Sequence, residues 1–111
     1  MIREIKETEF RDAINSDSEK IKVVDFYATW CNPCNMLSPI LEQLDANNEN
    51  LDIYKIDVDA NSRLADELDI NSVPSVFFYK GGEIKKLVLG FQPLQSLQSI
   101  VDQIKWKRPM I

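Results

Sequence analysis

Residues 21–34 read IKVVDFYATWCNPC, a segment that contains both cysteines of the chain. Its first part, up to Thr29, is mostly apolar and rich in β-branched and aromatic residues, a pattern typical of a central strand buried on both faces. Apolar residues then recur at helical spacing after the second cysteine, which predicts a helix from about Pro33 to Asn47. The two cysteines of the segment therefore stand where a buried strand meets the start of a helix.

Alternating strands and helices are predicted on both sides of this segment. Gly81 and Gly82 indicate the tight turn of a hairpin between the last two strands. The order of elements predicts an α/β fold, with a central mixed sheet of about five strands flanked by about four helices. With 111 residues, the chain is expected to form one domain over residues 1–111. We expect strands at residues 2–5, 21–29, 51–58, 76–79 and 84–89, and helices beginning near Thr8, Pro33, Asn61 and Pro93.

Composition and charge exclude several classes of function. The formal net charge is −5, so the chain lacks the long-range field that attracts nucleic-acid phosphates. No run approaches the roughly 18 apolar residues of a membrane span. The first residues also lack the apolar core of a secretory signal. We therefore expect a cytoplasmic protein without nucleic-acid or membrane partners, and nothing in the sequence requires more than a monomer.

The chain contains two cysteines, Cys31 and Cys34, and no histidine. A disulfide that closes so small a loop restricts the unfolded chain little, so it stabilises the fold poorly. A structural zinc site usually needs four Cys, His or carboxylate ligands, which argues against a metal site within one chain. A metal cluster bridged between two chains, or a pair of cysteines without a function, is also compatible with the motif. The favoured interpretation is a redox-active pair.

The position of the pair at a helix start favours redox chemistry. The first turn of a helix leaves backbone N–H groups unpaired, and its aligned peptide dipoles act as roughly half a positive charge. Both effects favour the thiolate of Cys31, which is the nucleophile in disulfide exchange. Cys34 follows one helical turn later as the resolving thiol, so we expect Cys31 to be exposed and Cys34 to lie behind it. Pro33 suits the first helical turn and keeps the loop closed.

Asp25 interrupts the most apolar run in the chain. Burial disfavours a carboxylate, so a buried Asp25 is expected to hold its proton near neutral pH. Such a group is suited to accept the proton of Cys34 when that thiol attacks. The alternative is an aspartate that points to water at the end of the strand. Lys55 lies within the strand predicted at residues 51–58, from which its ammonium reaches Asp25 if the two strands are neighbours; otherwise it is an exposed lysine.

Several segments together resemble the thioredoxin family, and the likeness covers nearly the whole chain. Residues 24–34 are similar to the active-site strand and redox loop of that family, and residues 72–75 (SVPS) to its cis-proline segment. Pro39 matches a proline that kinks the active-site helix. Lys55 matches a lysine near the buried aspartate, and Gly90 a glycine that leaves room for substrate.

The resemblance implies a thioredoxin fold and a protein-disulfide reductase that carries electrons through its own Cys31–Cys34 disulfide, with no bound cofactor. It implies a cis bond between Val73 and Pro74, which local sequence alone leaves open, with Val73 pairing to an extended segment of a protein substrate. The implied partners are disulfide-containing proteins and an NADPH-dependent thioredoxin reductase, since the chain itself lacks a Gly-rich dinucleotide loop. The resemblance adds three further positions to the docking surface: Trp30, Gly90 and Phe91.

Three residues depart from the family pattern. Asn32 replaces a usual glycine, Asn35 a usual lysine or arginine, and Tyr27 a usual tryptophan. Loss of a cation at position 35 disfavours the Cys31 thiolate, whereas a hydrogen bond donated by Asn32 would favour it, and the sequence does not determine which effect is larger. Asn32 and Pro33 are therefore candidates for tuning the redox potential. The absence of histidine argues for the reducing branch. Two rival functions remain. One is an oxidant or isomerase that donates its disulfide, and the other is a partner-binding module whose thiols take no part in its function.

Overall fold

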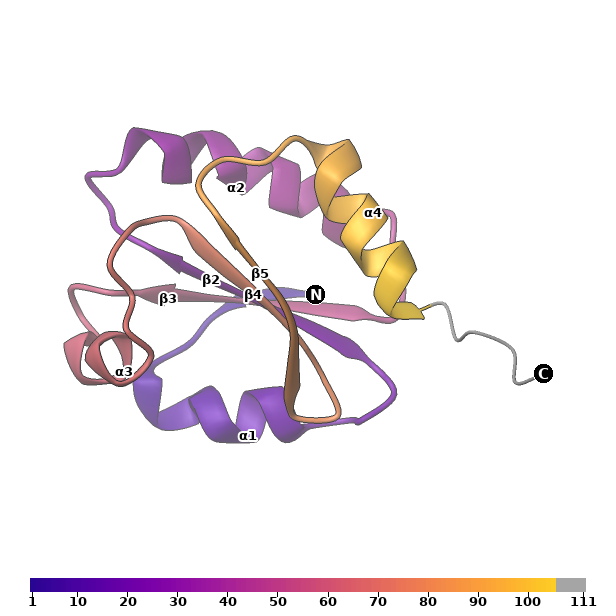
Figure 1. The fold of residues 1–111 in the computed structure, drawn as a ribbon, viewed down its shortest axis with the longest axis horizontal. Coiled ribbons are helices and arrows are strands. Elements are labelled where there is room, and N and C mark those ends of the chain that lie inside the picture. The colour runs from indigo at the N-terminus through magenta and orange to yellow at the C-terminus, as the bar shows by residue number, and fades with distance from the viewer. Residues whose placement is uncertain (106–111) are drawn as a thin grey trace.

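Strands and helices alternate along the chain in the predicted order, and the computed structural model describes residues 1–105 (Figure 1). The sheet has the strand order β1-β3-β2-β4-β5. Both β1 and β2 run parallel to β3, whereas β4 is antiparallel to β2 and to β5, which confirms the mixed sheet. In chain order the elements are β1 (Ile2–Glu4), the 3-10 turn η1 (Glu7–Glu9), α1 (Phe10–Asn15), β2 (Ile21–Tyr27), α2 (Asn32–Ala46), β3 (Leu51–Asp57), α3 (Ser62–Glu67), β4 (Ser75–Lys80), β5 (Glu83–Leu89) and α4 (Leu94–Lys105).

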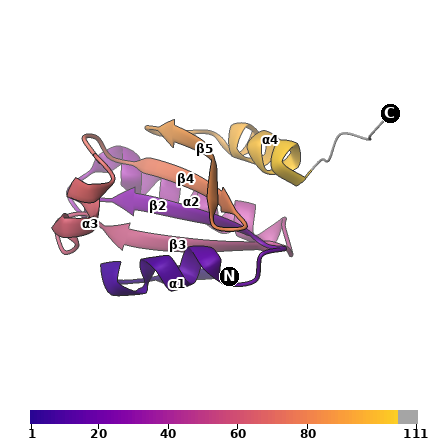
Figure 2. The ribbon, with the colours of Figure 1, turned by 60° about the horizontal axis from the view of Figure 1, so that its bottom comes forward.

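Helices cover both faces of the sheet. Figure 1 shows α2 and α4 on one face and α1 and α3 on the other, and the turned view of Figure 2 shows the same layers. The side chains of β2 alternate between the two cores. Val23 packs with residues of α2 and α4, and Val24 packs with residues of α1 and α3. Since β2 is buried at every position from Ile21 to Phe26, the prediction of a central strand buried on both faces is confirmed.

α2 begins close to its predicted position and carries the cysteine motif at its first turn. Pro33 lies in that turn, where its fixed φ and missing N–H suit the helix. The buried face of α2 includes Leu37, Leu41 and Leu44, and these side chains hold the helix on the sheet. No helix within residues 1–105 has the length and hydropathy that crossing a bilayer takes.

The helix predicted to begin near Thr8 begins later, at Phe10, whereas the helix start predicted near Asn61 is confirmed. Thr8 caps no helix, because it lies inside η1. Asn61 stands at the N-cap position of α3, but its side chain accepts from the Glu7 amide at 2.8 Å and donates to the Asp57 carbonyl at 2.9 Å. The Glu7 carboxylate instead accepts from the Leu64 N–H, at 2.9 Å, in the first turn of α3. The acceptor for a free N–H group in the first turn of α3 therefore comes from a residue far away in the chain. A local sequence pattern does not reveal such a partner.

Lys22 is a fully buried side chain of β2 that sequence patterns did not single out. Its ammonium donates to the backbone carbonyls of Ser16, Asp17 and Lys20. Hydrogen bonds to a charged donor are among the stronger ones in proteins. Lys22 therefore ties the connection between α1 and β2 to the central strand.

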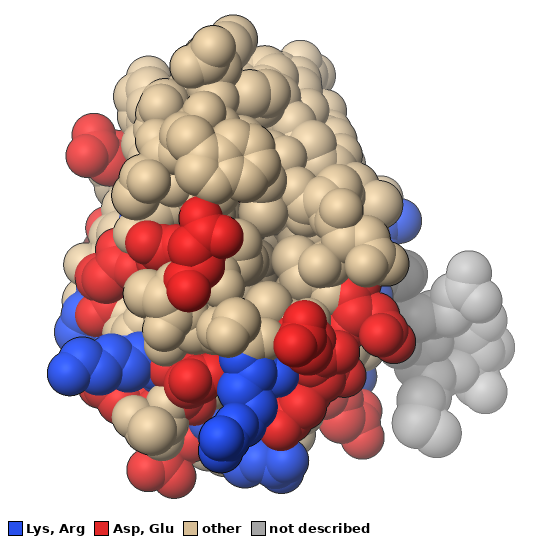
Figure 3. Space-filling view, turned by 90° about the vertical axis from the view of Figure 1, so that its left-hand side faces the viewer, with Lys and Arg blue, Asp and Glu red and all other residues tan. Residues whose placement is uncertain are grey.

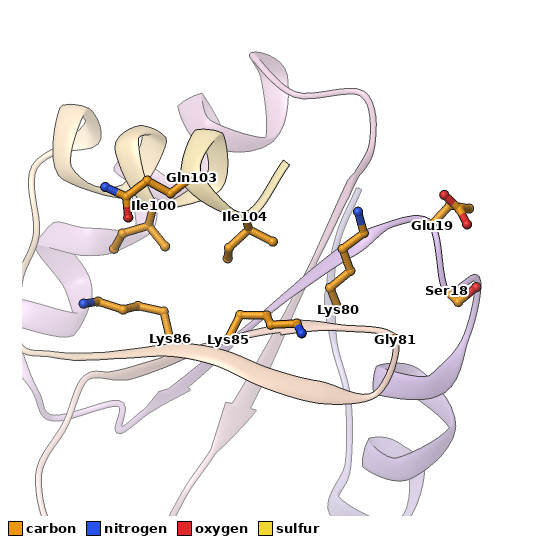
Figure 4. A pocket seen from close by; sticks show the side chains of 9 residues that line it. All are labelled: Ser18, Glu19, Lys80, Gly81, Lys85, Lys86, Ile100, Gln103 and Ile104. Carbon is orange, nitrogen blue, oxygen red and sulfur yellow. The ribbon is translucent and has the colours of Figure 1, made fainter. Parts of the chain in front are cut away.

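β5 forms an exposed edge of the sheet. Figure 4 shows the pocket between this strand and α4, with Ile100 and Ile104 of α4 pointing toward the strand that carries Lys85 and Lys86. Lysines on an edge strand oppose the pairing of another chain. None of the residues that line this pocket belongs to the cysteine motif, so the chemistry is located at another part of the molecule.

Candidate functional site

Cys31 and Cys34 form a disulfide at the start of α2, with their Cα atoms 5.3 Å apart. Cys31 is the N-cap residue of the helix, and its Sγ accepts a hydrogen bond from the Cys34 backbone N–H at 3.2 Å. One of the unpaired donors of the first turn therefore points at the sulfur of Cys31. The same donor favours a negative charge on that sulfur after reduction.

Both sulfurs are buried in the disulfide form, and the expectation of an exposed Cys31 is wrong. The exposed fraction is 4% for Cys31 and 2% for Cys34. The two residues pack with Ala28 in a small cluster. Val73 covers the sulfur of Cys31 from another part of the chain, with its carbonyl oxygen 3.7 Å from Sγ. This contact joins segments 42 residues apart, so the local sequence around the motif does not indicate it.

The segment around Pro74 lies beside the cysteines. The peptide bond between Val73 and Pro74 is cis, as the resemblance implied. The Gly90 N–H donates to the Pro74 carbonyl at 2.8 Å, which brings the end of β5 to the same place. Gly90 has φ +82°, and a Cβ there would meet nothing within 4 Å. A glycine is favoured at this position by its backbone conformation, and open space lies beside it.

Two aromatic side chains of the predicted docking surface are exposed. The exposed fraction is 70% for Trp30 and 39% for Phe91. The Trp30 indole donates to the Asp59 carboxylate at 2.9 Å. Sequence analysis missed Asp59, although it follows β3 and the carboxyl ends of the parallel strands β2 and β3 lie at the same edge. Asp59 holds the large ring in place next to Cys31.

The end of the molecule at which α2 begins faces the viewer in Figure 3. The upper part of this face is mostly uncharged, whereas acidic and basic side chains gather below it. Uncharged, partly apolar surface of this kind is typical of an interaction site. Asn32 and Pro33 are exposed at this end, and the Asn32 side chain makes no hydrogen bond with another residue in the described part of the chain.

Asp25 is fully buried, which excludes the alternative of a water-facing aspartate. Neither oxygen of its carboxyl has a hydrogen-bond partner within residues 1–105. Burial raises the pKa of Asp25 to about 7, since the charged form loses its hydration. The Lys55 ammonium opposes this rise of the pKa, and the Glu4 carboxylate adds to it. Asp25 is therefore able to hold or release a proton near neutral pH.

Lys55 is the register neighbour of Asp25 on β3, and β3 is an inner strand, so the alternative of an exposed lysine on an edge is wrong. Its ammonium donates to the Ser38 hydroxyl at 2.9 Å and lies 4.8 Å from the centre of the Tyr27 ring. The Tyr27 hydroxyl donates to the Glu4 carboxylate, whose oxygens lie 2.7 and 2.8 Å away. Burial and this hydrogen bond raise the pKa of Tyr27.

Ser38 and Glu4 were not predicted as members of the site. Ser38 follows Cys34 by four residues and therefore lies on the same side of α2. That spacing is the one signal in the sequence that could have indicated it. Glu4 lies on β1, and no pattern in the sequence connects it with Tyr27. Within residues 1–105, no group of three or more His, Cys, Asp or Glu side chains is placed to hold a metal ion.

Comparison with known proteins finds matches over nearly the whole chain. The thioredoxin family model matches residues 1–103. The chain is 35% identical over 104 residues to thioredoxin-2 of Saccharomyces cerevisiae, covering 94% of this chain and 100% of that protein. It is 38% identical over 103 residues to the thioredoxin of Staphylococcus haemolyticus, covering 92% and 96%.

The fold of this chain is also similar to solved thioredoxin structures. A mutant thioredoxin from Halobacterium salinarum superposes with a TM-score of 0.87 at 30% identity, covering 97% of this chain and 94% of that one. Chloroplastic thioredoxin z superposes with a TM-score of 0.86 at 32% identity, covering 94% of both chains. The fold, the helix-capping disulfide and these relatives agree, so the chain belongs to the thioredoxin family and is a dithiol–disulfide oxidoreductase that acts on proteins through Cys31 and Cys34.

Proposed function

We propose that the chain acts in the reducing direction, with Cys31 as the nucleophile and Cys34 as the resolving thiol. The Cys31 thiolate attacks one sulfur of a substrate disulfide, and the other substrate sulfur leaves as a thiolate. The Cys34 thiolate then attacks Cys31 Sγ, which forms the internal disulfide and releases the dithiol substrate. The observation that carries this assignment is the Cys34 N–H donated to Cys31 Sγ at the helix start. It favours the anion on the sulfur of Cys31.

Asp25 accepts the proton that Cys34 must lose before it attacks. A pKa of about 7 suits a group that exchanges protons near neutral pH, because both of its protonation states are then accessible. Lys55 modulates Asp25 through its positive charge. Asn32 and Pro33, which form the turn between the two cysteines, tune the redox potential by setting the surroundings of Cys31.

Substrates dock on the uncharged surface around the disulfide. The Val73 backbone pairs with an extended segment that carries the substrate disulfide, in the manner of an added strand. The contact of the Val73 carbonyl with Cys31 Sγ supports this, since a segment paired there lies against the nucleophile. Four further residues complete the surface, namely Trp30, Pro74, Gly90 and Phe91.

The internal disulfide returns to the dithiol by reaction with an NADPH-dependent thioredoxin reductase. NADPH supplies the two electrons to that reductase, and the chain passes them on as an electron carrier with no cofactor of its own. A cytoplasmic location suits this role, because thioredoxin systems keep protein thiols reduced there. The chain works as a monomer in this scheme, since one copy carries both cysteines.

The redox equilibrium with glutathione tests the direction of the reaction. We expect the Cys31–Cys34 couple to be strongly reducing, so that the disulfide form predominates at glutathione ratios that keep isomerases partly reduced. The measurement is the fraction of each form after alkylation and mass analysis at a series of glutathione ratios. A potential near the roughly −180 mV of protein disulfide isomerase would support the oxidant or isomerase function instead.

A further inference from the structure

We propose that Ser38 is a positioning residue for Asp25, because its hydroxyl holds the Lys55 ammonium toward α2 and out of hydrogen-bond contact with the buried carboxyl. Two observations are explained together by this arrangement. The Lys55 ammonium has a hydrogen bond to Ser38 at 2.9 Å, and the Asp25 carboxyl has no partner within residues 1–105 although Lys55 is its neighbour in the sheet register. The attraction between the two charges therefore acts through space and not through a direct ion pair.

The surroundings of Lys55 hold its ammonium from two sides. Ser38 approaches from α2, and the face of the Tyr27 ring lies 4.8 Å away, at a distance that favours a cation–π contact. The Tyr27 ring is itself fixed by the hydrogen bond of its hydroxyl to Glu4 on β1. A lysine side chain is otherwise flexible and turns toward the strongest acceptor it reaches. These contacts explain why Lys55 remains separated from Asp25.

The groups around Asp25 come from every neighbouring element. Lys55 acts on it from β3 and Glu4 from β1, and these two are the charges that alter its titration. The register neighbour on β4 is Val76, which is apolar. Cys34, in the first turn of α2, is disulfide-bonded and does not titrate in this form. In the disulfide form, a movement of the Lys55 ammonium would therefore change the pKa of Asp25.

Removal of the Ser38 hydroxyl frees the ammonium to pair with the Asp25 carboxylate. An opposite charge that comes into contact favours the ionised form of a carboxyl. In Ser38→Ala we expect the titration midpoint of Asp25 to fall by roughly one pH unit. In Ser38→Thr, which keeps a hydroxyl at the same place, the midpoint is expected to stay where it is in the unchanged chain.

The measurement is the ¹³C chemical shift of the Asp25 carboxyl as a function of pH, in the full chain with the disulfide intact. The signal is assigned by its absence in Asp25→Asn. The control compares Ser38→Ala with Ser38 in a chain that also carries Lys55→Met. In that chain no ammonium is present, so removal of the Ser38 hydroxyl cannot free one to approach Asp25. We expect no effect of Ser38→Ala in that background. An unchanged or raised midpoint in Ser38→Ala, or the same fall in the Lys55→Met background, would overturn the positioning role.

The consequence for turnover rests on the proposed function of Asp25 and is measured separately. Reduced protein releases thionitrobenzoate from an aromatic disulfide in two steps, the attack of Cys31 and the resolution by Cys34. We expect the pH profile of the second step to move with the Asp25 midpoint in Ser38→Ala. If the midpoint moves and the second step does not follow, the proton-transfer role of Asp25 fails while the positioning by Ser38 stands.

Discussion

Cys31→Ser is expected to reduce protein-disulfide reduction to the background rate of the assay. A serine hydroxyl remains protonated at neutral pH, and neither the helix start nor the Cys34 N–H turns it into a nucleophile that attacks a disulfide. The assay is the reduction of insulin disulfides with dithiothreitol as the electron source. Gln43→Ser, an exposed change on the same helix, is the control and is expected to retain full activity.

Cys34→Ser distinguishes the two cysteines. It leaves the Cys31 sulfur and the backbone N–H of residue 34 in place, so the first attack is expected to proceed. Without a resolving thiol the reaction stops at the mixed disulfide, which accumulates and is detected as an added mass on the chain. Turnover by Cys34→Ser at the unchanged rate contradicts the assignment of the resolving thiol.

Full biological activity of Cys31→Ser would favour the partner-binding module in place of a reductase.

Asp25→Asn is expected to slow the resolving step by about 10²-fold, the lower end of the range for a positioned proton acceptor. The attack of Cys31 is expected to be largely unaffected, because its thiolate is stabilised by the helix start and not by Asp25. The two steps are separated by rapid mixing of reduced protein with an aromatic disulfide. An equal loss in both steps contradicts proton transfer by Asp25 and indicates a general disturbance of the site.

The same substitution is expected to raise the stability of the protein at alkaline pH. The pKa of Asp25 is about 7 in the folded chain against an ordinary value of 3.8, so the folded state binds this proton more tightly than the unfolded state does. The stabilisation is therefore fully present below pH 3.8 and is lost as the pH rises to about 7. Above that range the buried carboxylate costs about 4 kcal/mol, since a tenfold difference in proton affinity between the two states corresponds to about 1.4 kcal/mol.

Urea unfolding at several pH values measures this effect. Asparagine carries no charge at any of these pH values, so Asp25→Asn is expected to be more stable than the unchanged chain at pH 8 by a few kcal/mol. The difference is expected to grow between pH 4 and pH 7. A difference of the same size at every pH indicates that the substitution acts through packing and not through the ionisation of Asp25.

Local patterns predicted the elements that depend on neighbouring residues. The apolar run of β2, the helical spacing after Cys34 and the Gly81-Gly82 turn each specify one element through its own residues, and the structure has these elements. The burial of Asp25 followed from its place in that run. The cis bond before Pro74 came from the family resemblance, since local sequence left it open.

Contacts between distant segments were the part that sequence analysis missed. The Glu7 carboxylate accepts a hydrogen bond from the N–H of Leu64, which lies 57 residues away in the first turn of α3. The Val73 carbonyl covers the sulfur of Cys31, so the expectation of an exposed Cys31 was wrong. The hydrogen bond of Lys55 to Ser38 likewise joins β3 to α2. Such pairs depend on how the layers pack, and the periodicity of a single element contains no information about its partner.

The pH dependence of Cys31 alkylation tests the central role of the helix start most directly. Reduced Cys34→Ser protein is treated with iodoacetamide over a range of pH, so that the rate reports the thiolate of Cys31 alone. We predict a midpoint well below the roughly 8.5 of an ordinary cysteine, because the donor and the dipole at the first turn of α2 favour the anion. A midpoint at that ordinary value contradicts the account.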